Sequence, residues 1–175
     1  MRLLRSRHLV IRSGGQTGVD RAALDCAVAK SIPYVGWCPR GGWAEDFAAP
    51  PGLLERYPRL TETPSPAPAQ RTAWNVRDSA ATLIIVGSEG LDVSPGTKLA
   101  VTCAETFERP CYVADLASPD ACRDAAAWLA RLLESTQRAV GHSLVLNVAG
   151  PRESESPGIY LAARAFINQA LEDTS

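Results

Sequence analysis

Twice in this chain a short apolar run leads through a glycine-bearing loop into a helical pattern. The first run, His8–Ile11, is followed by the loop Ser13–Asp20. The second run, Ala80–Val86, is followed by glycines and then by Ser94–Thr97, where a helix reaching about Phe107 begins. In open α/β sheets, the loops that follow neighbouring parallel strands converge on one crevice. The two units therefore predict an α/β protein with a site built from both loops.

Each loop has the chemistry of an anion site. Glycine carries no Cβ, so the backbone can turn tightly and come close to a ligand. The helix that follows presents unpaired backbone N–H groups and the positive end of its dipole, where phosphate and other oxyanions bind. Gln16 and Thr17 add hydrogen-bond donors without adding charge. Either loop alone is also compatible with an ordinary strand-to-helix turn, but two such loops in one domain favour the anion site.

The rest of the chain keeps alternating between strand and helix patterns. Further strands are predicted at 33–38, 111–114 and 143–148. Further helices are predicted at 19–31, 70–79 and 120–136, the last broken at Gly141, and a final helix begins with Ser156 as its N-cap and Pro157 in its first turn. Ala80–Val86 is continuously apolar, which is typical of a strand covered on both faces. The pattern predicts a doubly wound, mostly parallel α/β sheet with helices on both faces.

Residues 50–69 are rich in proline, with six prolines between Pro50 and Pro68. Such a segment is unsuited to a helix or to a central strand. A linker is one interpretation, but leucines and Tyr57 give the segment apolar surface to bury. We therefore expect an ordered excursion over a single domain that spans 1–175, with an ordered core at 8–172.

Charge and hydropathy exclude two classes of partner. The net charge of the 175 residues is −1 at pH 7, so no overall field attracts nucleic acid or an anionic membrane. No apolar run approaches the roughly 20 residues that span a bilayer. Met1–Arg7 is basic, lacks the apolar segment of a secretory signal, and is expected to be a frayed end. We expect a cytoplasmic protein whose anion site is local.

Cysteine and histidine give little support for metal or triad chemistry. The five cysteines are scattered and never form a Cys-x-x-Cys arrangement, which indicates neither a disulfide framework nor a zinc site. His8 and His142 are the two histidines. Because each lies at the start of a strand or at a turn, we interpret both as structural.

Several blocks of the chain resemble the molybdenum cofactor carrier protein family. The resemblance runs from Ile11 to Leu171 and is carried by Ser13–Ala22, Gly36–Pro39, Ala44–Asp46, Arg71-Thr72, Trp74–Ser79, Asn147–Ser154 and Pro157–Tyr160. It implies a Rossmann-like fold related to the lysine-decarboxylase-like phosphoribohydrolases and to DNA-processing protein A. It also implies a homo-oligomer, either a tetramer or a dimer.

The resemblance implies a ligand as well as a fold. Carriers of this family bind molybdenum cofactor, a pterin that bears a phosphate and a dithiolene-held oxo-metal, and they protect it and deliver it to molybdoenzymes. A carrier needs no catalytic residue, so the resemblance implies a binding protein rather than an enzyme. By resemblance, the residues at the ligand are Gly14, Gly15, Gln16, Thr17 and Gly18, with Gly96 and Thr97 opposite and with Arg77 and Arg152 as cationic partners. For Arg152 the alternative is a structural ion pair with Glu153 or Asp78.

Two positions depart from the family pattern. Pro95-Gly96-Thr97 stands where the family usually has Gly-Gly-Thr, and a proline removes one N–H donor from the second loop. Gly42-Trp43 stands where basic residues usually follow, which removes charge but offers an aromatic face on which a pterin or a purine can stack.

Two other functions stay open at this point. The first is a nucleotide phosphoribohydrolase, which in the related enzymes carries a glutamate just after the threonine of the second loop. Here Lys98-Leu99-Ala100 follows Thr97, and Glu105 is eight residues further on, which counts against catalysis. The second is a sensor that binds a nucleotide-derived signal, since a sensor too needs only an anion pocket.

Overall fold

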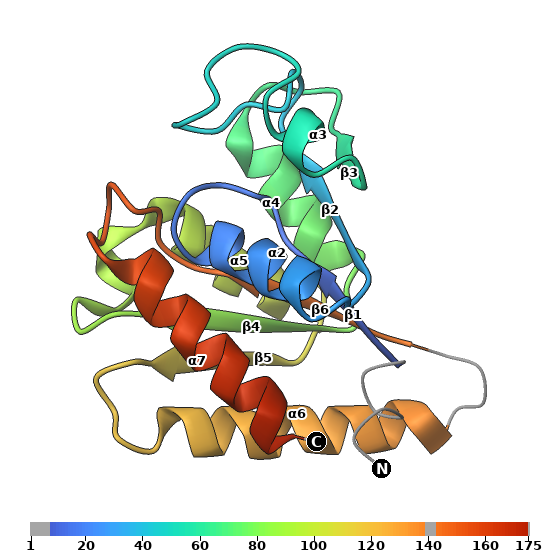
Figure 1. Ribbon diagram of the computed structural model, residues 1–175, viewed down its shortest axis with the longest axis vertical. Coiled ribbons are helices and arrows are strands. Elements are labelled where there is room, and N and C mark those ends of the chain that lie inside the picture. Colours follow the sequence, from blue (N-terminus) through green and yellow to red (C-terminus); the bar gives the residue numbers. More distant parts are fainter. Residues whose placement is uncertain (1–7, 139–142, 175) are drawn as a thin grey trace.

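The computed structural model describes residues 8–138 and 143–174 (Figure 1). The predictions for Met1–Arg7, Gly141 and His142 concern residues outside the described ones. The described part is built on a six-stranded sheet in the order β3-β2-β1-β6-β4-β5, and every pairing is parallel. The strands are β1 (Leu9–Arg12), β2 (Tyr34–Cys38), β3 (Leu60–Glu62), β4 (Ala81–Val86), β5 (Cys111–Asp115) and β6 (Leu144–Ala149).

The position of β6 sets the topology. The chain runs outward from β1 through β2 to β3, and outward in the other direction from β4 to β5. Strand β6 comes last in the chain yet lies between β1 and β4, and it pairs Asn147 with Arg12 on one side and with Thr82 on the other. The order of strands thus reverses at β6, and such a reversal leaves a crevice at the carboxyl ends of the strands. The predicted doubly wound, Rossmann-like sheet is confirmed.

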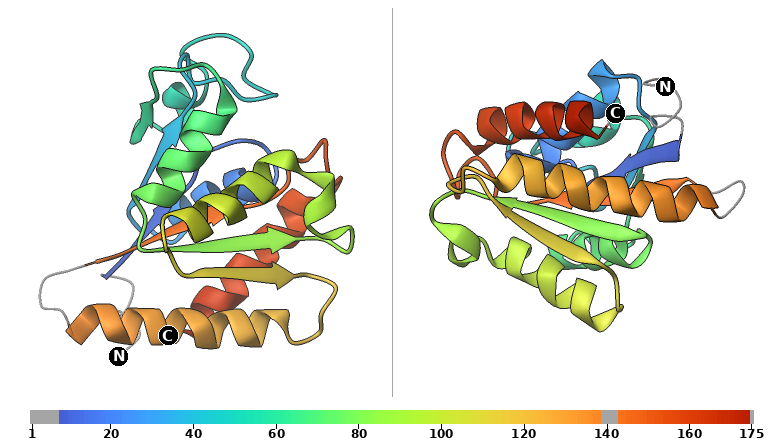
Figure 2. Two further views of the ribbon diagram at one scale, coloured as in Figure 1. Left: turned by 180° about the vertical axis from the view of Figure 1, so that it is seen from behind. Right: turned by 90° about the horizontal axis from the view of Figure 1, so that it is seen from below.

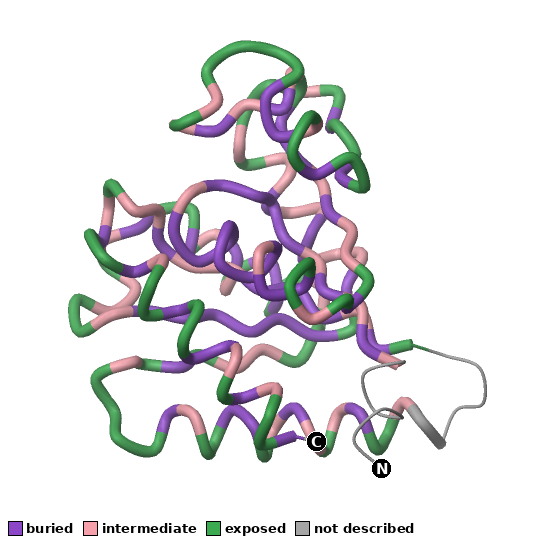
Figure 3. The backbone as a smooth tube through the Cα atoms, viewed as in Figure 1, coloured by how far each residue is buried: buried purple, intermediate pink, exposed green. Residues whose placement is uncertain are grey.

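Helices cover both faces of the sheet (Figure 2). One face carries α2 (Val19–Ala29), α6 (Ala121–Arg138) and α7 (Ile159–Asp173), and α7 packs along both α2 and α6. The other face carries α4 (Pro68–Arg77) and α5 (Pro95–Thr106), which pack on each other. Because β4 is covered on both sides, all of its residues are buried, as its continuous apolar run predicted (Figure 3).

The proline-rich excursion contains two short elements that the sequence did not predict. These are α3 (Leu53–Arg56) and the three-residue strand β3. Strand β3 is tolerated because it lies at the edge of the sheet, with the prolines before and after it rather than within it. The excursion buries apolar side chains of Leu53, Tyr57 and Leu60 in a small second core with Leu24, Cys38 and Ala44.

The start of the last helix differs from the prediction. Helix α7 begins at Ile159 with Gly158 as its N-cap, so Ser156 does not cap it and Pro157 precedes it. The cap is the carboxylate of Glu153, whose two oxygens accept the backbone N–H groups of Gly158 at 2.5 Å and Tyr160 at 2.9 Å. A carboxylate that reaches back over the first turn satisfies two N–H groups and opposes the dipole.

Candidate ligand-binding site

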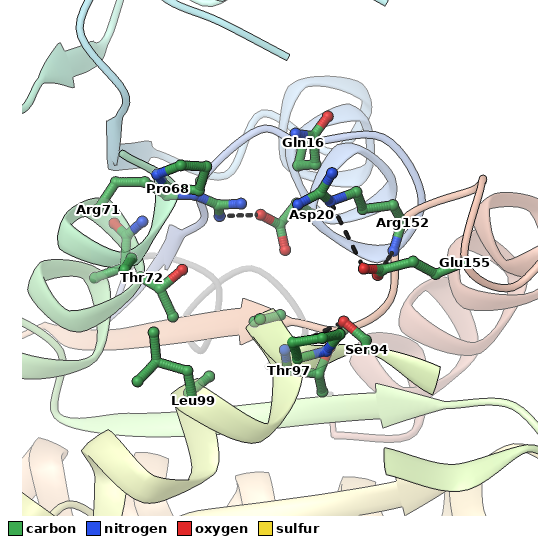
Figure 4. Close-up of a pocket in the computed structure, with 18 of the residues that line it drawn as sticks. Gln16, Asp20, Pro68, Arg71, Thr72, Ser94, Thr97, Leu99, Arg152 and Glu155 are labelled. Carbon is green, nitrogen blue, oxygen red and sulfur yellow. Dashed lines mark hydrogen bonds and ion pairs between the residues drawn. The ribbon is translucent and has the colours of Figure 1, made fainter. Parts of the chain in front are cut away.

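A pocket of about 250 Å³ lies at the carboxyl ends of the central strands (Figure 4). It is bounded by the loops after β1 and β6 and by the first turns of α4 and α5. Of the residues that the resemblance placed at a ligand, those lining the pocket are Gly14, Gln16, Gly96, Thr97 and Arg152. The other polar lining residues were not among the predicted ligand contacts, although several lie in the blocks that carry the resemblance; they are Asp20, Arg71, Thr72, Asn75, Ser94, Asn147 and Glu155.

A buried ion pair crosses the pocket wall at Gly14. The Arg71 Nη1 atom lies 2.7 Å from Asp20 Oδ2, and the two side chains are 11% and 4% exposed. A Cβ added at Gly14 would come within 1.9 Å of Arg71 Nη1 and 2.9 Å of Asp20 Oδ2. Burial raises the pKa of Asp20, although the nearby Arg71 guanidinium opposes that shift. Gly14 is therefore required because any side chain there would collide with the ion pair.

Gly15 and Gly18 turn away from the pocket. Both have positive φ, at 73° and 76°. A Cβ at Gly15 would lie 3.2 Å from carbons of Leu53 and Leu60 in the second core, and one at Gly18 would lie 2.2 Å from the carbonyl oxygen of Pro151. Neither residue lines the pocket. Their conformational freedom lets the β1 loop pack against its neighbouring loops.

The side chains of Gln16 and Thr17 fasten three loops together. The Gln16 Oε1 atom accepts the backbone N–H groups of Thr17 at 3.0 Å and Glu45 at 2.9 Å. The Glu45 carboxylate accepts hydrogen bonds from the hydroxyl of Thr17 and from that of Ser154 at 2.6 Å. Partial burial would raise the pKa of Glu45, but the hydrogen bonds from Ser154 and Thr17 outweigh it and hold the pKa below its ordinary value. Thr17 does not line the pocket.

A second carboxylate pins the same loop to α2. The Asp46 carboxylate accepts hydrogen bonds from both terminal nitrogens of Arg21, at 2.8 and 2.9 Å. The Arg21 Nε atom donates a hydrogen bond to the carbonyl of Gly15 at 3.1 Å. The hydrogen bonds from Arg21 lower the pKa of Asp46. A bidentate pair of this kind fixes geometry as well as charge. The loop around residues 39–47 is thus held in place by two of its own carboxylates, Glu45 and Asp46.

Arg77 lies outside the pocket. Its Nε and Nη2 atoms donate to the two carboxylate oxygens of Asp78 at 2.7 and 3.0 Å, and its guanidinium lies 4.7 Å from the ring centre of Trp74. It is the last residue of α4, and the residues of that helix that line the pocket are Pro68, Ala69, Arg71, Thr72 and Asn75. Its charge is therefore committed to a neighbouring carboxylate away from the pocket.

The first turn of α5 faces the open space of the pocket. Ser94 caps the helix by accepting the N–H of Thr97 at 3.2 Å and the Thr97 hydroxyl at 2.8 Å. A Cβ added at Gly96 would meet no atom within 4 Å. Within the described part of the chain, the Gly96 N–H has no hydrogen-bond partner. Because Pro95 has no N–H, Gly96 is the donor that this turn offers, at the positive end of the dipole.

The second arginine of the pocket, Arg152, is held loosely. Its Nε atom lies 3.8 Å from Glu155 Oε1, beyond hydrogen-bond distance, and its side chain is 33% exposed. Glu155 instead accepts the backbone N–H of Arg152 at 3.0 Å. The partners expected from the sequence are engaged elsewhere, Glu153 at the start of α7 and Asp78 with Arg77. Arg152 can therefore exchange its partner at little cost, unlike Arg71.

Amide side chains form the floor of the pocket. Asn147 is 2% exposed, and its Nδ2 atom lies 3.4 Å from the hydroxyl of Thr82. Asn75 is tied to the backbone of Trp37, accepting its N–H at 2.8 Å and donating to its carbonyl at 2.9 Å. These contacts attach α4 to β2 and give the pocket a polar, rigid base.

Other features of the described chain concern metal binding, membrane-spanning helices and the protonation of its thiols. In residues 8–138 and 143–174 no three His, Cys, Asp or Glu side chains are grouped as metal ligands. No described helix is long and apolar enough to cross a bilayer. The cysteines are free thiols, and burial raises the pKa of Cys38 to about 11, which keeps that thiol protonated.

Comparison with known proteins gives two matches. The circularly permutated YpsA SLOG family matches residues 11–171. The crystal structure of the putative molybdenum carrier protein from Syntrophus aciditrophicus SB is similar in fold, with a TM-score of 0.77. The two sequences are 38% identical, and the match covers 94% of this chain and 94% of that chain. No curated protein sequence matches this chain.

Proposed function

Since this chain belongs to the circularly permutated YpsA SLOG family, we propose that it is a carrier that binds molybdenum cofactor in the pocket at the carboxyl ends of β1, β6 and β4. The observation that supports this most is the placement of Arg152 and the Gly96 N–H in one pocket. Both can donate a hydrogen bond to a phosphate without first breaking a strong hydrogen bond or ion pair. The name of the similar protein from Syntrophus aciditrophicus SB, a molybdenum carrier, supports the same ligand.

The phosphate end of the ligand fits the side of the pocket that Arg152 and the first turn of α5 form. A phosphate gains charge-assisted hydrogen bonds from a guanidinium, which are about twice as strong as neutral ones. The first turn of α5 adds about 0.3–1 kcal/mol for an anion at its dipole. To make these bonds Arg152 gives up a 3.8 Å contact with Glu155 and a position 6.0 Å from the ring centre of Trp43.

Arg71 has a different role in this proposal. Its guanidinium is held at 2.7 Å by a carboxylate that is almost fully buried, so releasing it would leave Asp20 as an unpaired buried charge. The two arginines of the pocket face two carboxylates, Asp20 and Glu155, so the formal charges balance. Affinity then comes from local donors rather than from a strong positive field.

The arrangement suits storage rather than catalysis. Asp20 is paired with Arg71, Glu155 is turned to the backbone of Arg152, and Glu105 does not line the pocket. Molybdenum cofactor is the cargo, and its own dithiolene holds the metal, so the protein needs only to bind the phosphate and the ring. We also propose a cytoplasmic homo-oligomer, a dimer or a tetramer, that passes the cofactor to molybdoenzymes.

The test is to identify the ligand that the protein retains. We expect protein purified from a host that makes molybdopterin to carry near-stoichiometric pterin, detected by mass spectrometry and by pterin fluorescence. Arg152→Gln protein from the same host should carry much less, whereas Arg123→Gln, an exposed arginine of α6 with a side chain 70% exposed, should match the wild type. A bound nucleotide, or no pterin even after cofactor is added, would contradict the proposal.

A further inference from the structure

A second hollow adjoins the pocket that Arg71 and Arg152 line, which we call the arginine pocket. It has a volume of about 430 Å³ and is lined by Trp43, Arg40 and the prolines Pro50, Pro66 and Pro68, among others. Pro68, in the first turn of α4, lines both hollows, and in Figure 4 it lies beside Arg71 at the rim of the first. A ligand in the arginine pocket can therefore extend past Pro68 into the second hollow.

The lining of this hollow matches a flat ring. The indole ring is planar, the proline rings add apolar surface, and aromatic side chains stack on other planar rings. Among the described residues that line the hollow there is no carboxylate, and Arg40 is the charged one. Ligand sites combine apolar surfaces of this kind with a few polar groups that set orientation. The chemistry fits a planar heteroaromatic ring.

The backbone around Trp43 is fixed before any ligand binds. Gly42 has φ of 65°, a Cβ there would lie 2.3 Å from the carbonyl oxygen of Pro51, and its own carbonyl accepts the N–H of Leu53 at 2.8 Å. On the other side of Trp43, Ala44 is fully buried and exchanges hydrogen bonds with Phe47 at 3.2 and 2.9 Å. Binding then costs little ordering of the loop, which favours affinity.

Arg152 connects the two hollows. It lines the arginine pocket, and its guanidinium carbon lies 6.0 Å from the ring centre of Trp43. A single ligand can thus place an anionic group at the guanidinium and a ring at the indole. The distance between the two parts is short enough for one small molecule.

We propose that the Trp43 hollow is the ring subsite of this protein, where a planar heteroaromatic ring stacks on the indole while the phosphate of the same ligand binds at Arg152 and Gly96. The inference rests on the proposed function for the phosphate end alone. It assigns Trp43 as the residue that distinguishes a pterin phosphate from phosphates without a ring.

The experiment compares Trp43→Leu with the wild type against two probes. Molybdopterin carries the ring and the phosphate, and ribose 5-phosphate carries a phosphate without a heteroaromatic ring. Stacking of a base on an aromatic side chain is worth about 1–3 kcal/mol, so we expect the variant to bind molybdopterin at least about fivefold more weakly. Its affinity for ribose 5-phosphate should change less than twofold. Trp128→Leu on α6, half-buried against Tyr112 and outside both hollows, is the matched control.

The outcomes separate the subsite from the proposed function. Unchanged molybdopterin affinity in Trp43→Leu, with strong binding by the wild type, would overturn the subsite and leave the carrier proposal standing. Equal loss for both probes would also overturn the subsite, because the tryptophan would then support the phosphate end. If guanosine 5′-monophosphate binds tightly in place of molybdopterin and loses affinity in the variant, the ring subsite is supported and the carrier proposal is contradicted. A wild type that binds no probe overturns both.

Discussion

The guanidinium of Arg71 lies 2.7 Å from the carboxylate of Asp20, and both groups lie where a side chain at Gly14 would be. The two residues are 51 positions apart in the chain and come from α4 and α2. Their ion pair joins the two sides of the sheet crevice, so the wall of the pocket and the stability of the fold depend on the same contact.

Asp20→Asn is expected to destabilise the protein strongly. The change removes one charge and leaves the Arg71 guanidinium buried without its counter-charge, which costs about 3–5 kcal/mol. Urea unfolding followed by circular dichroism gives the free energy of unfolding. Arg123→Gln, which breaks exposed ion pairs on α6, should cost less than about 1 kcal/mol in the same measurement. Equal effects of the two variants would show that the Asp20 pair is not structural.

Arg152→Gln and Glu155→Gln are expected to change ligand affinity in opposite directions. The first removes a charge-assisted hydrogen bond, worth about 1.5–3 kcal/mol, so molybdopterin should bind at least about tenfold more weakly. The second removes the carboxylate that competes for the guanidinium, so binding should become several-fold tighter. Isothermal titration calorimetry measures both. Weaker binding by Glu155→Gln would mean that this carboxylate itself contacts the ligand.

Two glycines of the pocket are expected to respond differently to alanine. Gly14→Ala places a methyl group 1.9 Å from Arg71 Nη1, so the ion pair must move and the melting temperature should fall. Gly96→Ala finds open space at an ordinary φ, so the melting temperature should stay the same or rise slightly. Because its methyl group enters the pocket beside the free N–H, Gly96→Ala should still weaken phosphate binding. Unchanged affinity in Gly96→Ala would place the phosphate elsewhere.

Stability is expected to fall in acid, as the pH drops below about 4, because of Asp46. Its pKa is lowered in the folded protein by the hydrogen bonds from Arg21, against an ordinary value of 3.8. A depressed pKa means that the carboxylate contributes stability above its unfolded pKa and loses that contribution as the pH falls through the folded value. Urea unfolding from pH 7 down to pH 3 should therefore show a steeper loss for the wild type than for Asp46→Asn. Parallel curves would show that Arg21 does not stabilise the ionised form.

The local part of the fold could be predicted because it depends on residues that are close together in the sequence. The apolar run of β4 and the glycine loops indicate strand, turn and helix within a few positions, and the structure has them there. Strand β3 was not predicted, because three residues at an edge among prolines carry no periodic signal. The insertion of β6 between β1 and β4 depends on pairings between distant segments, which no local pattern contains.

The site was harder to predict for a physical reason. Within the β1 loop, Gly14 and Gln16 line the pocket, whereas Gly15, at a φ of 73°, faces the second core and Thr17 is hydrogen-bonded to Glu45. The resemblance assigned the same ligand-binding role to all five residues of the loop, and only their packing in the fold distinguishes them. Asp20 and Arg71 lay within the blocks that carried the family resemblance, yet the reason for their presence is a contact across the fold. The binding roles of the loop residues, and the oligomeric state, stay predictions.

The place of β6 has a consequence for the order of events during synthesis. Strands β1 and β4 do not pair with each other; both pair with β6, whose first residue is Leu144. A chain still on the ribosome without that strand lacks the partner of both β1 and β4, and it also lacks Arg152, which lines the pocket. Pairings between distant segments are also the slow ones in folding. The pocket is therefore completed only after β6 and the loop that carries Arg152 have been made, and a chain that stops before β6 lacks the strand that joins β1 to β4.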